Sequence, residues 1–152
     1  MIVVAAKPKI HALKSVQDEF ERLEEKFRER FEWKCEPLSA AEIAEIYKRS
    51  SIYIQPSFYE AFGLCILEAM ASGNAVIASN IGGIPEVVGD AGVLVNLGEK
   101  EFTNSIQKFL DDRKGLEKYR ILAAKRAEQF DWNIIAKKTL DLYKKIEKSG
   151  KR

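Results

Sequence analysis

The most informative part of the sequence is Pro56–Gly73, which reads PSFYEAFGLCILEAMASG. Just before it, Ile52–Ile54 is a short apolar run that predicts a strand. Residues 62–72 are mostly apolar, which predicts a buried helix, and Gly73 is the residue type that commonly follows a helix end. The chain is therefore expected to pass here from a strand, through a loop, into a helix.

The start of this predicted helix has the character of an anion site. No charged side chain lies from Ala61 to Leu67, so the first N–H groups and the positive end of the helix dipole are left for an external anion. Because Gly63 lacks a Cβ, a phosphate can approach the amides of Phe62, Gly63 and Leu64 closely. The sequence thus predicts a diphosphate at this helix start.

Two glutamates flank the helix start. Glu68 lies about five residues into the helix, a rise of roughly 7 Å, which resembles the reach from a diphosphate to a ribose. A carboxylate can accept hydrogen bonds from both hydroxyls of a ribose diol. Glu60, in the preceding loop, can similarly bind hydroxyls of a sugar on the far phosphate. The alternative is purely structural, with Glu60 favoured by the helix dipole and Glu68 solvated.

Strands and helices alternate along the rest of the chain. The predicted strands are 2–6, 31–35, 52–54, 75–78 and 92–95. The predicted helices are 12–30, 39–47, 62–72, 85–88, 99–110, 116–130 and 133–148. A capping box at 39–42 opens the second helix, and 75–78 is apolar enough to be covered on both faces.

This alternation predicts one α/β domain over residues 1–152, ending in the C-terminal helices 116–148. The expected fold is a Rossmann-like open parallel sheet with helices on both faces. Such sheets bind ligands at the carboxyl ends of their strands.

Composition excludes several classes of protein. The chain has 152 residues, 46% hydrophobic and 32% charged, with a net charge of +2, as expected of a globular protein. Lysines and arginines alternate with glutamates instead of forming a basic stripe, so we expect no nucleic-acid partner. No apolar run approaches the ~20 residues of a membrane span, so we expect no membrane span and a cytoplasmic location.

No cofactor or metal site is expected. Cys35 and Cys65 lack the spacing of metal ligands and lie in segments that predict burial, which indicates reduced core thiols. The single histidine, His11, lies at a predicted helix start without a Ser or Asp partner, which favours a surface or capping role.

The central segment resembles the C-terminal, nucleotide-sugar-binding domain of the family 4 retaining glycosyltransferases of the GT-B fold, the glycosyl transferases group 1. That domain carries Pro-Ser, a Glu, a Phe-Gly pair, and a second Glu eight positions after the first, followed by Ala-Met-Ala-x-Gly. Glu60, Phe62, Gly63 and Glu68 match position by position. The resemblance continues through residues 39–57, 75–78, 82–88, 92–95 and 130–132.

The resemblance implies a role for each site residue. Glu68 would bind the ribose, the amides of Phe62, Gly63 and Leu64 the diphosphate, and Glu60, as the catalytic residue, the donor sugar near its reacting carbon. Members of the family transfer a sugar from a nucleotide diphosphate sugar with retention of configuration, typically without a tightly bound metal. Catalysis would then rest on electrostatic stabilisation and alignment.

The resemblance fails at the N-terminal end. The family's domain opens with a strand and loop that hold an Arg and a Lys against the diphosphate, and this chain is expected to start one strand later. Its first loop reads Ala6-Lys7-Pro8-Lys9, where the family is usually Gly-rich. Lys7 and Lys9 either replace the missing cations or are solvated. We expect an N-terminal GT-B domain or subunit as partner, and weak donor binding without turnover by the isolated chain.

Three questions stay open from the sequence. The chain is alternatively a non-catalytic scaffold or regulatory subunit of GT-B fold that acts through a partner chain. The last amphipathic helix either drives assembly into a homo-oligomer or folds onto its own core. Gly82 and Gly83 are expected to form a tight turn whether or not a ligand is near.

Overall fold

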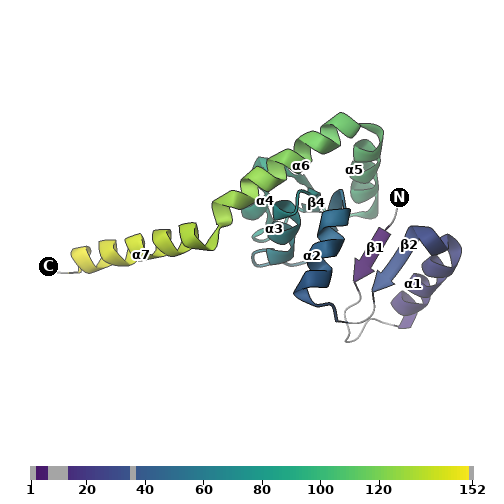
Figure 1. Ribbon diagram of the computed structural model, residues 1–152, viewed down its shortest axis with the longest axis horizontal. Helices are drawn as coiled ribbons and strands as arrows, with labels where there is room; N and C mark the ends of the chain where they lie inside the picture. The colour runs from purple at the N-terminus through teal and green to yellow at the C-terminus, as the bar shows by residue number, and fades with distance from the viewer. Residues whose placement is uncertain (1–2, 7–13, 35–36, 151–152) are drawn as a thin grey trace. The chain divides into compact units, whose positions relative to one another are not determined.

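The computed structural model describes residues 3–6, 14–34 and 37–150 (Figure 1). Its contacts divide the chain into two compact units, Met1–Ile46 and Tyr47–Arg152, and each is described by itself. Both units have an α/β composition. The expectation of a single domain over residues 1–152 stays a prediction.

The first unit is built on a pair of parallel strands. Its elements are β1 (Val3–Ala6), α1 (Lys14–Phe27), the 3₁₀ turn η1 (Arg28–Arg30), β2 (Phe31–Lys34) and most of α2 (Ala40–Arg49). The ring of Phe20 on α1 lies against that of Phe31 on β2, with centroids 5.9 Å apart. The predicted strand–helix–strand order is confirmed within the described residues.

The predicted capping box is present at the start of α2. The backbone N–H and the hydroxyl of Ser39 both donate to Glu42 Oε2, at 2.8 and 2.6 Å, and the Glu42 N–H donates to Ser39 Oγ at 3.3 Å. These bonds from Ser39 hold the pKa of Glu42 below its usual value. The helix therefore begins where the sequence predicts.

The second unit contains a three-stranded sheet. Its elements are the last residues of α2, β3 (Ile52–Gln55), α3 (Leu64–Ala71), β4 (Ala75–Ser79), α4 (Ile84–Val88), η2 (Gly89–Ala91), β5 (Val93–Val95), α5 (Glu99–Asp111), α6 (Arg113–Ala127), η3 (Glu128–Phe130) and α7 (Trp132–Ser149). The strand order is β3-β4-β5, and both pairings are parallel. The prediction of an open parallel sheet is confirmed.

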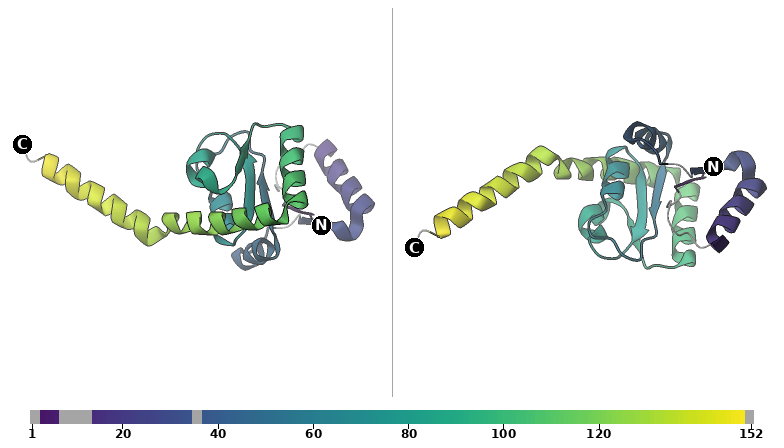
Figure 2. Two further views of the ribbon diagram at one scale, coloured as in Figure 1. Left: turned by 90° about the horizontal axis from the view of Figure 1, so that it is seen from above. Right: turned by 90° about the horizontal axis from the view of Figure 1, so that it is seen from below.

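Helices cover both faces of this sheet (Figure 2). Every residue of the central strand β4 is buried. Val76 and Ala78 pack among residues of α3, α4 and α6, whereas Ala75 and Ile77 pack against Phe102 and Phe109 of α5. An apolar run without alternation is what a strand buried on two faces requires, and that prediction is confirmed.

Helix α3 begins two residues later than predicted. Gly63 has φ +97°, a left-handed conformation, and cannot be part of a right-handed helix. The helix ends at Ala71, and Gly73 has φ +78°, consistent with the predicted stop. The eight residues from Leu64 to Ala71 therefore form the helix proper.

The last helix, α7, differs from α3, α4, α5 and α6 because no residue of it is buried. It projects away from the sheet of its own unit (Figure 2). The interpretation that this helix folds fully onto its own core is therefore wrong. Across the described residues, no helix combines the length and apolarity needed to cross a membrane. A cytoplasmic location stays a prediction.

Candidate functional site

The candidate site is built where two neighbouring strands end. The loop that carries Glu60 follows β3, and a second loop, residues 80–83, follows β4, which is paired with β3 in parallel. Because parallel strands end at the same edge, the two loops meet there. The Gly83 N–H donates to the Glu60 carbonyl oxygen at 3.0 Å. This bond fixes the backbone of Glu60.

Gly82 and Gly83 are needed for this close approach. A Cβ on Gly82 would lie 2.1 Å from the carbonyl oxygen of Glu60, and a Cβ on Gly83 would lie 2.1 Å from that of Ala61. Gly82 also has φ +55°. The sequence predicted only a tight turn here, so it missed that the glycine pair supports the Glu60 loop. A pair of glycines directly after a buried strand was the available signal.

The start of α3 lacks a side-chain cap, but one of the three amides predicted to bind a diphosphate is not free. No side chain caps the helix, and Gly63 at the cap position is buried. The Phe62 N–H already has a partner, because it donates to Glu60 Oε1 over 3.4 Å. The structure thus brings Glu60, Phe62, Gly63 and Leu64 together at one helix end, with the Glu60 carboxylate directly beside the predicted diphosphate position.

Phe62 contacts η3, the 3₁₀ turn that follows α6. Its ring meets that of Phe130 edge to face, with centroids 6.0 Å apart. The Arg126 guanidinium lies 5.1 Å from the centre of the Phe130 ring and donates to the carbonyl oxygens of Glu86 and Val87, at 2.6 and 3.1 Å. Arg126 thereby joins α4 to Phe130, and Phe130 in turn contacts Phe62 in the loop before α3.

Glu68 lies on the exposed side of α3, one to two turns from the helix start. The Tyr47 hydroxyl donates to Glu68 Oε2 over 3.5 Å, and the rings of Tyr47 and Tyr53 meet edge to face with centroids 5.7 Å apart. Sequence reasoning missed both tyrosines. Tyr47 lies 21 residues before Glu68, and only the fold brings them together.

The two glutamates act on the same phenol. Burial raises the pKa of Tyr53 above its ordinary value, and the negative charges of Cys65, Glu68 and Glu60 raise that pKa further. Both carboxylates therefore lie close enough to Tyr53 to influence its titration.

Cys65 is exposed and unpaired, so the prediction that it is a core thiol is wrong. Helix α3 is apolar except for Glu68, but only Ile66, Ala69 and Met70 are buried, and Cys65 lies outside that face. Cys35, His11, Lys7 and Lys9 lie outside the described residues. Within the described ranges, no three His, Cys, Asp or Glu side chains are grouped as a metal site.

Comparison with known proteins gives the family. The model of the glycosyl transferases group 1 matches residues 17–128. The α-maltose-1-phosphate synthase of Mycolicibacterium smegmatis is 36% identical over 124 residues, which are 75% of this chain and 32% of that protein. The D-inositol 3-phosphate glycosyltransferase of Paenarthrobacter aurescens is 35% identical over 111 residues, 71% of this chain and 27% of that protein.

Solved structures agree with this grouping. HepE of Anabaena, in complex with UDP, matches with a TM-score of 0.75 and 26% identity over 87% of this chain and 36% of that one. The C-terminal domain of a glycosyl transferase group 1 family protein from Francisella tularensis matches with a TM-score of 0.64 and 26% identity, over 77% of this chain and 64% of that one.

The predicted GT-B domain fold is therefore confirmed. The chain spans about a third of the length of the curated relatives it matches. The family model covers most of the chain, including both loops of the site and all of α3. The chain belongs to the glycosyl transferases group 1 family.

Proposed function

We propose that this chain is the donor-binding part of a retaining glycosyltransferase and binds a nucleotide diphosphate sugar between Glu60 and Glu68. One observation carries the proposal. An uncapped helix start with a carboxylate beside it lies at the carboxyl edge of a parallel sheet, and a second carboxylate follows further along the same helix. A structurally similar protein, HepE of Anabaena, was solved with UDP, which supports a uridine nucleotide as the first ligand to try.

In this proposal each group meets one part of the donor. The N–H groups of Gly63 and Leu64 bind the diphosphate, and the Phe62 N–H joins them when Glu60 releases it. The freed Glu60 carboxylate binds hydroxyls of the donor sugar near the anomeric carbon. Glu68 accepts hydrogen bonds from the ribose diol.

The transfer breaks the bond between the anomeric carbon and the diphosphate oxygen and forms a bond from the acceptor oxygen to the anomeric carbon. The proton of the acceptor hydroxyl passes to the departing diphosphate. Negative charge develops on the departing diphosphate, where the end of α3 stabilises it. A helix end contributes up to ~2 kcal/mol, whereas enzymes lower barriers by ~8 kcal/mol or more. We therefore propose that the isolated chain binds donor weakly and needs an N-terminal GT-B domain or subunit for turnover.

Titration of the chain with UDP, GDP, ADP and their glucose conjugates, by calorimetry or ligand-observed NMR, tests the donor site. We expect one nucleotide to bind and Glu68→Ala to weaken it about tenfold or more, because a charged hydrogen-bond acceptor is worth roughly 1.5 to 3 kcal/mol. The matched control is Glu99→Ala, which removes an exposed glutamate from α5 on the other face of the sheet.

Two results would count against the donor site. The first is that none of these nucleotides binds at millimolar concentration. The second is that Glu68→Ala and Glu99→Ala change the affinity equally. Release of UDP from UDP-glucose, measured in the same samples, is expected to stay at the buffer rate, and release above that rate would contradict the need for a partner domain.

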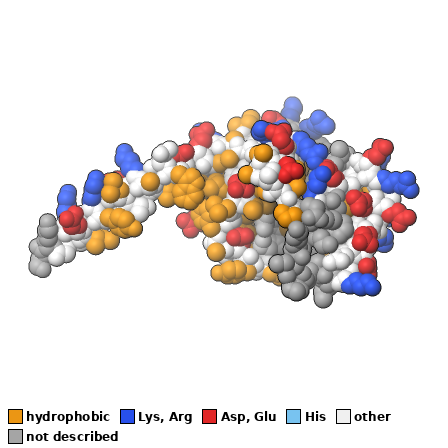
Figure 3. Space-filling view, turned by 60° about the horizontal axis from the view of Figure 1, so that its bottom comes forward, with side chains coloured by type: hydrophobic (Ala, Val, Ile, Leu, Met, Phe, Trp, Pro, Cys, Tyr) orange, Lys and Arg blue, Asp and Glu red, His pale blue; other side chains and the backbone are white. Residues whose placement is uncertain are grey.

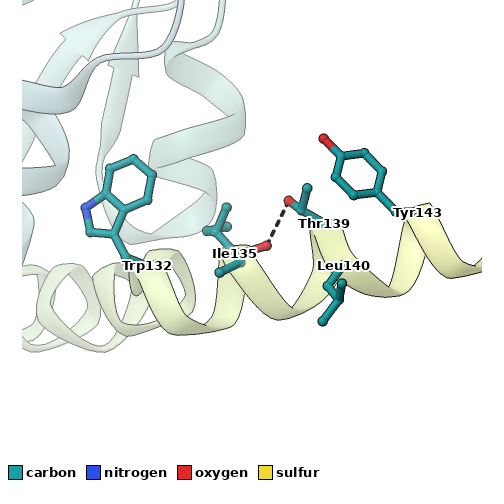
Figure 4. A pocket seen from close by; sticks show the side chains of 6 residues that line it. Trp132, Ile135, Thr139, Leu140 and Tyr143 are labelled. Carbon is teal, nitrogen blue, oxygen red and sulfur yellow. Dashed lines mark hydrogen bonds between the residues drawn. The ribbon is translucent and has the colours of Figure 1, made fainter.

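A second function, that of a scaffold or regulatory subunit, is favoured by the exposed face of α7. Hydrophobic side chains gather along this helix (Figure 3). An open apolar groove on it is lined by Trp132, Ile135, Ala136, Thr139, Leu140 and Tyr143 (Figure 4). This groove is not part of the Glu60 site. Light scattering after size exclusion distinguishes the two functions, since a scaffold is expected to assemble without nucleotide and to lose assembly, but no nucleotide affinity, in Leu140→Glu.

A further inference from the structure

The carboxylate of Glu68 is placed by the end of α2. Glu68 is exposed on α3, and a free glutamate side chain on a helix surface samples several rotamers. Here the Tyr47 hydroxyl donates to its Oε2 over 3.5 Å. The bond occupies one carboxylate oxygen and leaves Oε1 for a ligand.

Tyr47 is itself fixed relative to α3. The side chain of Asn74, which is fully buried, donates to the carbonyl oxygen of Tyr47 at 2.9 Å and to that of Ala69 at 3.0 Å. Ala69 is the residue directly after Glu68. One buried amide therefore joins the backbone that carries the phenol to the backbone that carries the carboxylate.

The ring of Tyr47 is also held in place. It packs edge to face on Tyr53, and the Tyr53 hydroxyl donates to Gln55 Oε1. The Gln55 side chain donates in turn to Ser57 Oγ at 2.7 Å, in the loop that leads to Glu60. Three hydrogen bonds and one ring contact thus connect Glu68 to Ser57, in the loop that leads to Glu60.

The Tyr47 phenol remains a hydrogen-bond donor at neutral pH. Burial raises its pKa above the ordinary value of 10.0, and nearby negative charges, including that of Glu68, raise that pKa further. The protonated phenol can donate to the Glu68 carboxylate, whereas a phenolate would repel it.

We propose that Tyr47 is a positioning residue that orients the Glu68 carboxylate toward the ribose of the donor nucleotide, an inference that rests on the proposed donor site. A carboxylate held in its binding rotamer loses less entropy when ligand arrives. Tyr47 is expected to act on the ribose hydroxyls alone and not on the diphosphate. The chemistry that it selects for is a ribonucleotide diphosphate over its 2′-deoxy counterpart.

The test compares affinities for UDP and 2′-deoxy-UDP, or for the corresponding GDP or ADP pair if that nucleotide binds more tightly. Removal of one hydroxyl in Tyr47→Phe is expected to lower the preference for the ribonucleotide about three- to tenfold. The 2′-deoxynucleotide should weaken less, because only its 3′-hydroxyl reaches Glu68. Glu68→Ala should abolish the preference, and Tyr47→Phe should then have no further effect on it.

The control is Tyr119→Phe, which removes a hydroxyl from the cluster on the other face of the sheet and should leave the preference intact. A merely structural role for Tyr47 would weaken both nucleotides equally and overturn the inference. Because the preference is a ratio measured on one sample, partial unfolding of a variant does not change it.

The two proposals fail in different ways. If Glu68→Ala removes the preference and Tyr47→Phe preserves it, the positioning inference is wrong and the donor site stands. If the wild-type chain binds no nucleotide, both are wrong.

Discussion

Helices α3 and α7 are stabilised in opposite ways. Helix α3 has no side-chain cap, yet Ile66, Ala69 and Met70 are completely buried. Helix α7 has an Asp131 cap, whose carboxylate accepts from the Asn133 N–H at 2.8 Å, yet none of its residues is buried. Tertiary packing therefore holds α3, and this leaves its first N–H groups available for a ligand. Helix α7 depends more on local interactions, and most of its apolar side chains are exposed.

The largest expected effect comes from comparing one alanine substitution in α3 with one in α7. Ile66→Ala is expected to destabilise the second unit by about 2 to 5 kcal/mol, because it opens a cavity among α3, β4 and α6. Leu142→Ala on α7 should change stability by less than about 0.5 kcal/mol, because Leu142 is exposed. Denaturant unfolding followed by circular dichroism measures both. Equal costs at the two positions would mean that α7 is buried in solution.

A smaller effect on stability is expected where the Glu60 loop contacts the loop of residues 80–83. Gly83→Ala places a Cβ against the carbonyl oxygen of Ala61, so the Glu60 loop must move, at a cost of about 1 to 3 kcal/mol and with loss of nucleotide binding. Gly73→Ala is the control. Gly73 has φ +78° but nothing near its Cβ position, so this variant should lose stability alone. Calorimetric titration measures the nucleotide affinity of both variants. Normal nucleotide binding by Gly83→Ala would contradict the prediction.

The smallest effect concerns the cap of α7. Asp131→Ala removes the acceptor of the Asn133 N–H and should cost roughly 1 kcal/mol of helix stability. Because α7 has no buried residue to compensate, we expect its first turn to fray. Amide hydrogen exchange of residues 132–136 measures this. Unchanged protection there, with the cap removed, would show that packing rather than capping stabilises the helix.

The sequence predicted those parts of the fold that depend on local chemistry. The capping box of Ser39 and Glu42 and the doubly covered strand Ala75–Ser79 follow from patterns within a few residues. The start of α3 was misplaced by two residues because the left-handed conformation of Gly63 is fixed by its surroundings. Burial of Cys65 was wrong because the composition of an apolar helix does not say which side faces the core.

The candidate site likewise contains residues that the local sequence predicts and residues that only the fold brings to it. Glu60, Phe62, Gly63, Leu64 and Glu68 lie within nine consecutive residues, so a local motif was enough to nominate them. The residues that support them come from far along the chain. Their contacts were invisible in the sequence because they depend on which strands are neighbours and which helix crosses the sheet. These distant supports are Tyr47, Asn74, Gly82, Gly83 and Arg126.

The exposed indole of Trp132 at the start of α7 allows coverage of this helix to be followed by intrinsic fluorescence. The sequence has two tryptophans, Trp33 and Trp132, and the side chain of Trp132 is 76% exposed at the apolar groove. Fluorescence emission from an indole shifts to shorter wavelength when water is replaced by apolar contacts. In a Trp33→Phe background, the emission of Trp132 would follow the coverage of α7 by any added domain or second copy, without a label.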